Sequence, residues 1–306
     1  MINNEYYSSI SKKDITGKSV ILAKNIDDKL TVIVKSSEDL DFSNVFKTDH
    51  LLLKTCSHIY IDEVFAGVFH IITCISEDLN IERDFMTTIS SIFSSNTESF
   101  SANQILDLFT SINNIFTVTP ERDTFDLQVG VFGELFSIKV LEDNGFYRLI
   151  DDWHSNFYTK HDIEIDKKNR IEIKATSKTE RIHEFNHDQI SRKDVNVYVV
   201  SLILEITEKG LSLSDLMDIM INRTTSLEKK ITIELLRKKC GLSQDNKGIC
   251  VSEELAINKM KIFDAKDLPQ ISSDIPDTIS NIRYNVDCTF INSINIFEFI
   301  KKFKTI

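Results

Sequence analysis

The sequence predicts a mixed α/β protein of the α+β kind, with a β-rich N-terminal lobe, a central core and a mostly helical C-terminal extension. Short apolar runs alternate with polar breaks over the first 75 residues. The order helix, three strands, helix, strand follows over residues 127–206, and helical spacing returns after residue 211. We therefore expect domains at residues 1–120, 121–210 and 211–306, the first ending where Thr119-Pro120 interrupts the pattern.

The N-terminal lobe is expected to begin with strands and to end with helices. Its first runs are short and rich in Val, Ile and Leu, whereas its last two segments have helical spacing. The expected strands are Ser19–Ala23, Leu30–Val34, His50–Lys54 and Phe65–Cys74, and the expected helices are Glu82–Phe93 and Asn103–Phe116.

The central segment carries the clearest pattern. Apolar residues recur at helical spacing within Leu127–Leu141, which predicts an amphipathic helix. Two runs of strict polar–apolar alternation, Asp162–Ile165 and Arg170–Ala175, flank a polar turn and predict a β-hairpin. After the hairpin we expect a third strand at Arg181–Phe185, a short helix capped by Asn186 and running to Lys193, and a buried strand at Val195–Ile206.

The C-terminal segment predicts two further helices, Ser212–Asn222 and Leu227–Lys239, the second of them ended by Gly241. Short mixed segments follow to the end of the chain. No motif in this part points to a chemistry.

Composition excludes several classes of protein. The chain has 306 residues and a net charge of −11, which argues against a protein that coats nucleic acid by its overall charge. This charge is still compatible with a local basic groove. The five cysteines form no C-x-x-C pair, which argues against a zinc finger and fits reduced thiols. Neither a secretory signal nor an apolar run long enough to cross a bilayer is visible, so we expect a cytoplasmic protein.

The predicted hairpin gathers charged side chains on one face. A period of two places Glu172 and Lys174 on the same side of their strand, and pairing of the apolar faces brings Asp162 close to them. Two carboxylates suit a hard cation such as Mg²⁺, and an ammonium beside them can orient a water or offset negative charge. Glu164 lies on the same face as Asp162 and is interpreted as structural or solvated.

These residues resemble the PD-(D/E)XK nuclease superfamily. Its nuclease core is similar to the pattern here: a helix that bears Glu134, then Asp162, then Glu172-x-Lys174. The chain resembles most closely one bacterial branch of the superfamily, which is found at restriction and phage-defence loci. The motifs that carry this likeness are Gly130–Phe136, Trp153, His161–Ile163, Ile171–Thr176, His183 and Asp188–Ile190. The resemblance implies a restriction-endonuclease-like αβββαβ core. His161 stands where the motif usually has a proline, which weakens the match without removing a ligand.

The resemblance also implies roles for individual residues. Asp162 and Glu172 would hold Mg²⁺, for which Mn²⁺ can substitute, with the Ile173 carbonyl as a third ligand. Glu134 would complete the metal site directly or through water, and Lys174 would be the catalytic lysine. Gln189, Lys178 and Arg181 are candidates for DNA contacts or for support of the site.

Charge in this segment favours a ligand that carries phosphate. Between Lys167 and Lys193 there are eight basic and four acidic residues, within a chain that is acidic as a whole. A basic segment beside a carboxylate pair is what a nuclease requires, although solvated loop lysines produce the same count.

The sequence therefore predicts a Mg²⁺-dependent DNA endonuclease of restriction or anti-phage defence that acts as a homodimer on DNA, with other subunits of a defence system as further partners and no membrane. The alternatives are a catalytically silent DNA-binding or scaffold subunit and an enzyme that acts on sugars through paired carboxylates. Lys174 and the basic segment favour phosphate over sugar.

Overall fold

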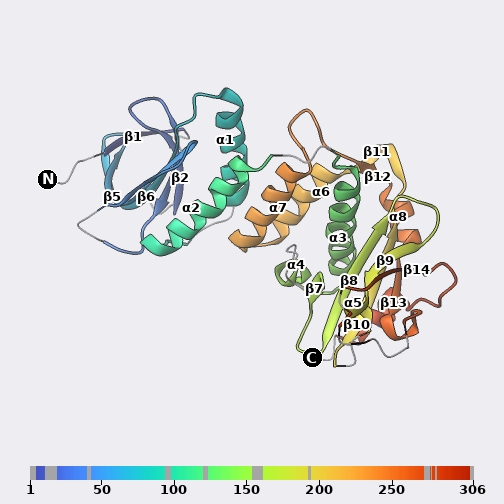
Figure 1. The fold of residues 1–306 in the computed structure, drawn as a ribbon. Helices are drawn as coiled ribbons and strands as arrows, with labels where there is room; N and C mark the ends of the chain where they lie inside the picture. Colours follow the sequence, from blue (N-terminus) through green and yellow to red (C-terminus); the bar gives the residue numbers. More distant parts are fainter. Residues whose placement is uncertain are drawn as a thin grey trace. The chain divides into compact units, whose positions relative to one another are not determined.

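The computed structural model describes residues 5–10, 19–39, 43–93, 98–119, 123–153, 161–191, 194–271, 276, 278–279 and 281–303. The chain forms two compact units, residues 1–119 and 120–306 (Figure 1). No helix in the described part of the chain is both long enough and apolar enough to cross a membrane.

The first unit is a six-stranded sheet followed by two helices. The strand order is β1-β2-β3-β6-β5-β4, and β1 also pairs with the second half of β5, so the sheet closes on itself around an apolar interior. This unit confirms the four strands and two helices expected for the N-terminal lobe. Its elements are β1 (Glu5–Ser9), β2 (Val20–Lys24), β3 (Leu30–Lys35), β4 (Val45–Lys47), β5 (Leu51–Ile61), β6 (Val64–Cys74), α1 (Leu79–Phe93) and α2 (Ala102–Thr117).

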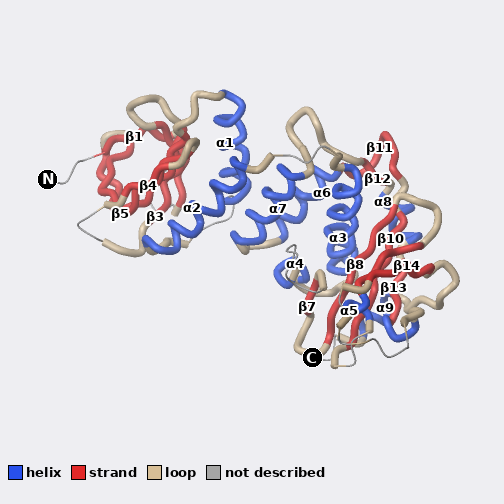
Figure 2. Tube along the Cα trace, viewed as in Figure 1, coloured by secondary structure: helices blue, strands red, loops and turns tan. Residues whose placement is uncertain are grey.

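The second unit is built around a four-stranded mixed sheet. Figure 2 shows its strands in red, with helices in blue beside them. The strand order is β13-β10-β8-β7, in which β8 and β10 are parallel and the two outer strands are antiparallel to their neighbours. Its elements are α3 (Phe125–Asp143), α4 (Leu149–Asp152), β7 (Ile163–Glu164), β8 (Asn169–Thr176), β9 (Ile182–Asn186), α5 (His187–Ile190), β10 (Asn196–Ile203), β11 (Ile206–Ser212), α6 (Leu213–Arg223), α7 (Leu227–Lys239), β12 (Cys250–Val251), α8 (Glu253–Lys259), β13 (Lys261–Asp264), η1 (Ala265–Asp267), β14 (Arg283–Asp287) and α9 (Ile296–Lys301).

The central sheet is apolar on both faces because β10 contributes alternate residues to two clusters. Tyr198 and Val200 pack with α3, α6 and α7, whereas Val197 and Val199 pack with β9, β13 and β14. Residues 211–306 therefore share the core of this unit, since they supply α6, α7 and one strand of the sheet.

The third strand expected in the central segment forms as β9, which pairs with β14 in a separate two-stranded sheet. Two other expectations for this segment are corrected by the structure. The run Val195–Ile206 is divided between β10 and the start of β11. The helix capped by Asn186 ends at Ile190, and residues 192 and 193 lie outside the described residues.

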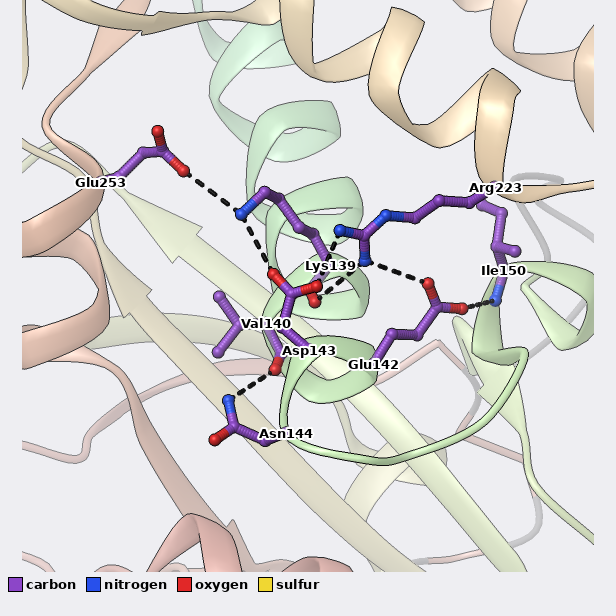
Figure 3. A network of polar contacts seen from close by, with 8 residues as sticks. All are labelled: Lys139, Val140, Glu142, Asp143, Asn144, Ile150, Arg223 and Glu253. Carbon is purple, nitrogen blue, oxygen red and sulfur yellow. Dashed lines mark hydrogen bonds and ion pairs between the residues drawn. The ribbon is translucent and has the colours of Figure 1, made fainter.

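A network of ion pairs fixes the C-terminal end of α3 (Figure 3). Arg223 of α6 contacts Asp143 at 2.7 Å and Glu142 at 3.4 Å, and Lys139 contacts both Asp143 and Glu253 of α8. Glu142 also accepts a hydrogen bond from the backbone of Ile150. Three helices are thereby fixed to the helix that carries Glu134: α4, α6 and α8.

Candidate active site

The β7–β8 hairpin places Asp162 opposite Glu172. Its turn is fixed by the Asp166 carboxylate, which accepts hydrogen bonds from the backbone of the two residues before Arg170. Ile163 then pairs with Ile171, so the next position along each strand places Asp162 across from Glu172. The Asp162 carboxylate accepts a hydrogen bond of 2.6 Å from the backbone N–H of Ile173.

Helix α3 approaches β8 closely enough to bring its own acid to the hairpin. A Cβ atom on Gly133 would lie 2.3 Å from Cβ of Ala175, so only glycine permits this contact without a shift. The next residue of the helix is Glu134, whose Oε2 accepts a hydrogen bond of 2.9 Å from Nε1 of Trp153. Glu134 interacts electrostatically with Asp162, Glu172 and Lys174.

Glu172 is the centre of the polar contacts. Its side chain is 2% exposed, and its Oε1 accepts from Nζ of Lys174 and from Nε2 of Gln189, each at 2.8 Å. The amide of Gln189 is oriented by the N-terminus of α5, where its own oxygen accepts from the backbone of Asn186. The ammonium of Lys174 also lies over the ring of Phe185, 5.3 Å from the centroid.

His161 connects the start of the hairpin to α5. Its ring is buried, and Nε2 lies 2.9 Å from the carbonyl oxygen of Gln189. The residue that replaces the motif proline therefore bonds the backbone of Gln189, whose side chain bonds Glu172.

Burial shifts the ionisation of the three acids in the same direction. It raises the pKa of Asp162 to about 6, against the opposing hydrogen bond from Ile173 and the charge of Lys174. Burial and the charge of Asp162 raise the pKa of Glu172 to about 8. Burial likewise raises the pKa of Glu134, against the hydrogen bond from Trp153. The cluster thus disfavours three negative charges even beside Lys174, and a second cation would favour them.

Lys174 keeps its charge in this environment. Burial by itself would lower the pKa of its ammonium, but the charge of Glu172 and the hydrogen bond to it, with the charges of Asp162 and Glu134, raise that pKa overall. A permanent ammonium among three acids can offset negative charge on a bound group.

The donor set fits a divalent cation. Oε2 of Glu172 is buried and has no hydrogen-bond partner in the described structure, so a carboxylate oxygen is free beside Asp162. Carboxylate oxygens are the ligands that Mg²⁺ and Mn²⁺ prefer. Within the described residues, however, no group of three or more His, Cys, Asp and Glu side chains is arranged to hold a metal ion. A cation would thus depend on one or two acids together with other oxygen ligands, as Mg²⁺ sites often do.

The remaining residues expected at the site lie in different surroundings. The side chain of Ile173 is buried in the core, and its backbone N–H binds Asp162. Lys178 is exposed in the turn after β8. Arg181 is buried, and its guanidinium donates to the oxygens of Ser201 and to the carbonyl of Lys259, so it joins β9 to β10 and α8 and does not face solvent.

Sequence reasoning assigned no role at the site to two residues, Trp153 and His161, that contact it. Trp153 belongs to the motifs of the resemblance but carries no predicted role; it is fully buried and donates to Glu134. His161 belongs to the same motifs and departs from their usual proline, and it too carries no predicted role. The one signal that could have indicated them is the presence of a buried N–H donor near a motif acid, and this is invisible before the fold is known.

Comparison with known proteins identifies one family. A family model described as "Putative PD-(D/E)XK family member, (DUF4420)" matches residues 16–289, which is well over half of the chain. Neither the curated proteins nor the solved structures gave a match. The match extends over both compact units and includes every residue of the acid cluster.

Proposed function

The chain belongs to this PD-(D/E)XK family, DUF4420, and from that premise we propose that it is a divalent-metal-dependent endonuclease that hydrolyses phosphodiester bonds in DNA. The observation that carries the proposal is the arrangement around Glu172. One of its oxygens is bound by Lys174 and Gln189, whereas the other is buried and unpartnered on the side chain that faces Asp162 across the hairpin.

The order of elements supports the same proposal. Helix α3, strands β7, β8 and β9, helix α5 and strand β10 follow one another as in an αβββαβ core. Strand β9 keeps its place in that order although it pairs with β14, and the ring of its Phe185 lies against the ammonium of Lys174.

Each side chain has a distinct task in the proposed reaction. Asp162 and Glu172 would hold Mg²⁺ or Mn²⁺ together with the Ile173 carbonyl, and Glu134 would complete the site through a bound water. Such a cation supplies stabilisation of the negative charge that develops on a phosphodiester during hydrolysis. Lys174 orients the attacking water and offsets charge on the phosphate, because its ammonium is held at 2.8 Å from Glu172. The products would carry 5′-phosphate and 3′-hydroxyl ends.

Exposed lysines around the hairpin favour a DNA backbone as the ligand. Lys167 and Lys168 occupy its turn, and Lys178 follows β8 at the opposite end. Cations of this kind contact phosphates without reading sequence. One active site per chain cuts one strand at a time, so we propose that two chains act together on duplex DNA, in a cytoplasmic restriction or anti-phage defence system.

Cleavage assays test the proposal. Purified protein is incubated with supercoiled plasmid and phage DNA in Mg²⁺, Mn²⁺ or a chelator. We expect metal-dependent cutting that is lost in Asp162→Asn, Glu172→Ala and Lys174→Ala. The matched control is Glu164→Gln, because Glu164 is an exposed acid on the same hairpin that pairs with Arg170 and not with the cluster.

The outcomes separate the proposal from its rival. Equal cutting by Asp162→Asn and wild-type protein would place the active site elsewhere. If wild-type protein does not cut DNA, even after addition of the products of neighbouring genes, the silent DNA-binding or scaffold role is favoured.

A further inference from the structure

Trp153 makes two hydrogen bonds that connect α7 to the acid cluster. Its indole Nε1 donates to Oε2 of Glu134 at 2.9 Å, and its backbone carbonyl accepts from Nζ of Lys229 at 2.5 Å. The residue is fully buried and extends the edge of the central sheet through a bridge to Ile163. Both its backbone and its ring are therefore fixed.

Lys229 is poorly placed for the stability of its own helix. It lies in the first turn of α7, next to the N-cap Ser226, where the helix dipole disfavours a cation. It is also 8% exposed, and burial of an ammonium costs free energy unless hydrogen bonds replace water. Its contact with the carbonyl of Trp153 offsets part of that cost.

The indole fixes the orientation of the Glu134 carboxylate. Nε1 donates its one proton to Oε2, and this bond restricts rotation of the carboxylate. Second-sphere donors of this kind orient ligands in metal sites and commonly alter metal affinity tenfold or more.

We propose that Trp153, held by Lys229, is a positioning residue that fixes the Glu134 carboxylate for a divalent cation at the acid cluster. The inference rests on the proposed function, because it requires that the cluster bind such a cation. It assigns to α7 an indirect part in the site, although α7 itself contributes no acid to the cluster.

The sequence supplies a direct probe for this inference. Trp153 is the single tryptophan of the chain, so all indole emission comes from the residue that contacts Glu134. Titration of the full chain with Mn²⁺ without DNA should change this emission in a saturable way. The change should disappear in Asp162→Asn, which weakens the site, and persist in Glu164→Gln.

Metal affinity tests the positioning role. Free Mn²⁺ is measured by electron paramagnetic resonance for wild type, Trp153→Phe and Lys229→Met, which remove the indole N–H and the ammonium respectively. We expect an increase in the Mn²⁺ dissociation constant of about tenfold for Trp153→Phe and a smaller increase for Lys229→Met. In a Glu134→Gln background neither substitution should have a further effect, because the carboxylate that they position is absent.

A matched control separates positioning from loss of packing. Phe132→Leu removes part of a fully buried ring on α3 and should lower the melting temperature without altering Mn²⁺ affinity. Mn²⁺ affinities unchanged in both Trp153→Phe and Lys229→Met, or reduced equally with and without Glu134, would overturn the inference alone. Failure of wild-type protein to bind Mn²⁺ would overturn it together with the metal dependence of the proposed function.

Discussion

Gly133 and Ala175 meet where α3 crosses β8, and the space between them leaves no room for a side chain on the helix. A Cβ at position 133 would lie 2.3 Å from that of Ala175. Gly130, one turn earlier on the same helix, has no described atom within 4 Å of the corresponding position. The two glycines of one helix therefore make opposite predictions.

Gly133→Ala should destabilise the second unit by about 1–3 kcal/mol, because the helix or the strand must move to admit the methyl group. Gly130→Ala should be neutral or should stabilise it by up to about 1 kcal/mol through helix propensity. Urea unfolding followed by Trp153 emission measures both. If the contact with Ala175 is tight, Ala175→Gly should restore stability to Gly133→Ala. Similar effects of Gly133→Ala and Gly130→Ala would show that the contact is not tight.

Glu172→Gln should stabilise the metal-free protein, and the gain should depend on pH. The folded-state pKa of Glu172 is about 8, above its ordinary value of 4.5, so the folded protein favours the protonated acid. Wild type accordingly loses free energy of unfolding as the pH rises from 4.5 through 8, whereas the amide does not titrate. The melting temperature of the variant should exceed that of wild type by a few degrees at pH 8 and by little at pH 4.5.

Divalent metal supplies the control for this prediction. Mn²⁺ at pH 8 should raise the melting temperature of wild type and narrow the difference, because it binds the ionised acid of the folded state. A variant less stable than wild type at pH 8 would contradict the assignment of a raised pKa to Glu172.

Arg223 should contribute to the stability of the end of α3 through its contacts with Glu142 and Asp143. The network in Figure 3 is partly exposed, so Arg223→Gln should cost about 1 kcal/mol, and the cost should fall as salt is added. Urea unfolding at low and high salt measures it. Arg283→Gln is the matched control, because Arg283 pairs with the exposed acid Glu184 at 3.7 Å, and the substitution should have almost no effect. If the loss of unfolding free energy in Arg223→Gln does not depend on salt, packing of the Arg223 side chain contributes more than its ion pairs do.

Local patterns were sufficient to predict most helices and strands, and distant partners explain the differences. Helical spacing placed α3 correctly, because most of its apolar residues lie in one core, whereas Phe125 at its start is exposed. The pairing of β9 could not be foreseen, since its partner β14 lies about a hundred residues further along the chain. In the same way, the acids of the cluster were visible as a motif, whereas the donors Trp153 and His161 act through contacts that only the folded chain brings together.

His70 should make the first unit sensitive to acid. It is fully buried, its Nδ1 accepts from the backbone N–H of Cys56, and its Nε2 contacts the carbonyl oxygen of Phe100. Burial lowers the pKa of His70 below its ordinary value of 6.5. The unfolded chain therefore binds a proton more readily, so this stabilisation is complete above pH 6.5 and is lost as the pH falls through the lowered folded-state pKa.

Hydrogen exchange at Cys56 measures this effect where it arises. A protonated Nδ1 cannot accept a hydrogen bond, so protection of the Cys56 amide, corrected for intrinsic exchange, should decrease as the pH falls through the lowered pKa of His70. In His70→Gln, whose amide does not titrate, protection should be lower at pH 7 and should depend little on pH. His58→Gln is the matched control on the same strand as Cys56, because His58 is partly exposed and is not bonded to that amide. Protection that declines equally in wild type and His70→Gln would assign the acid sensitivity to another group.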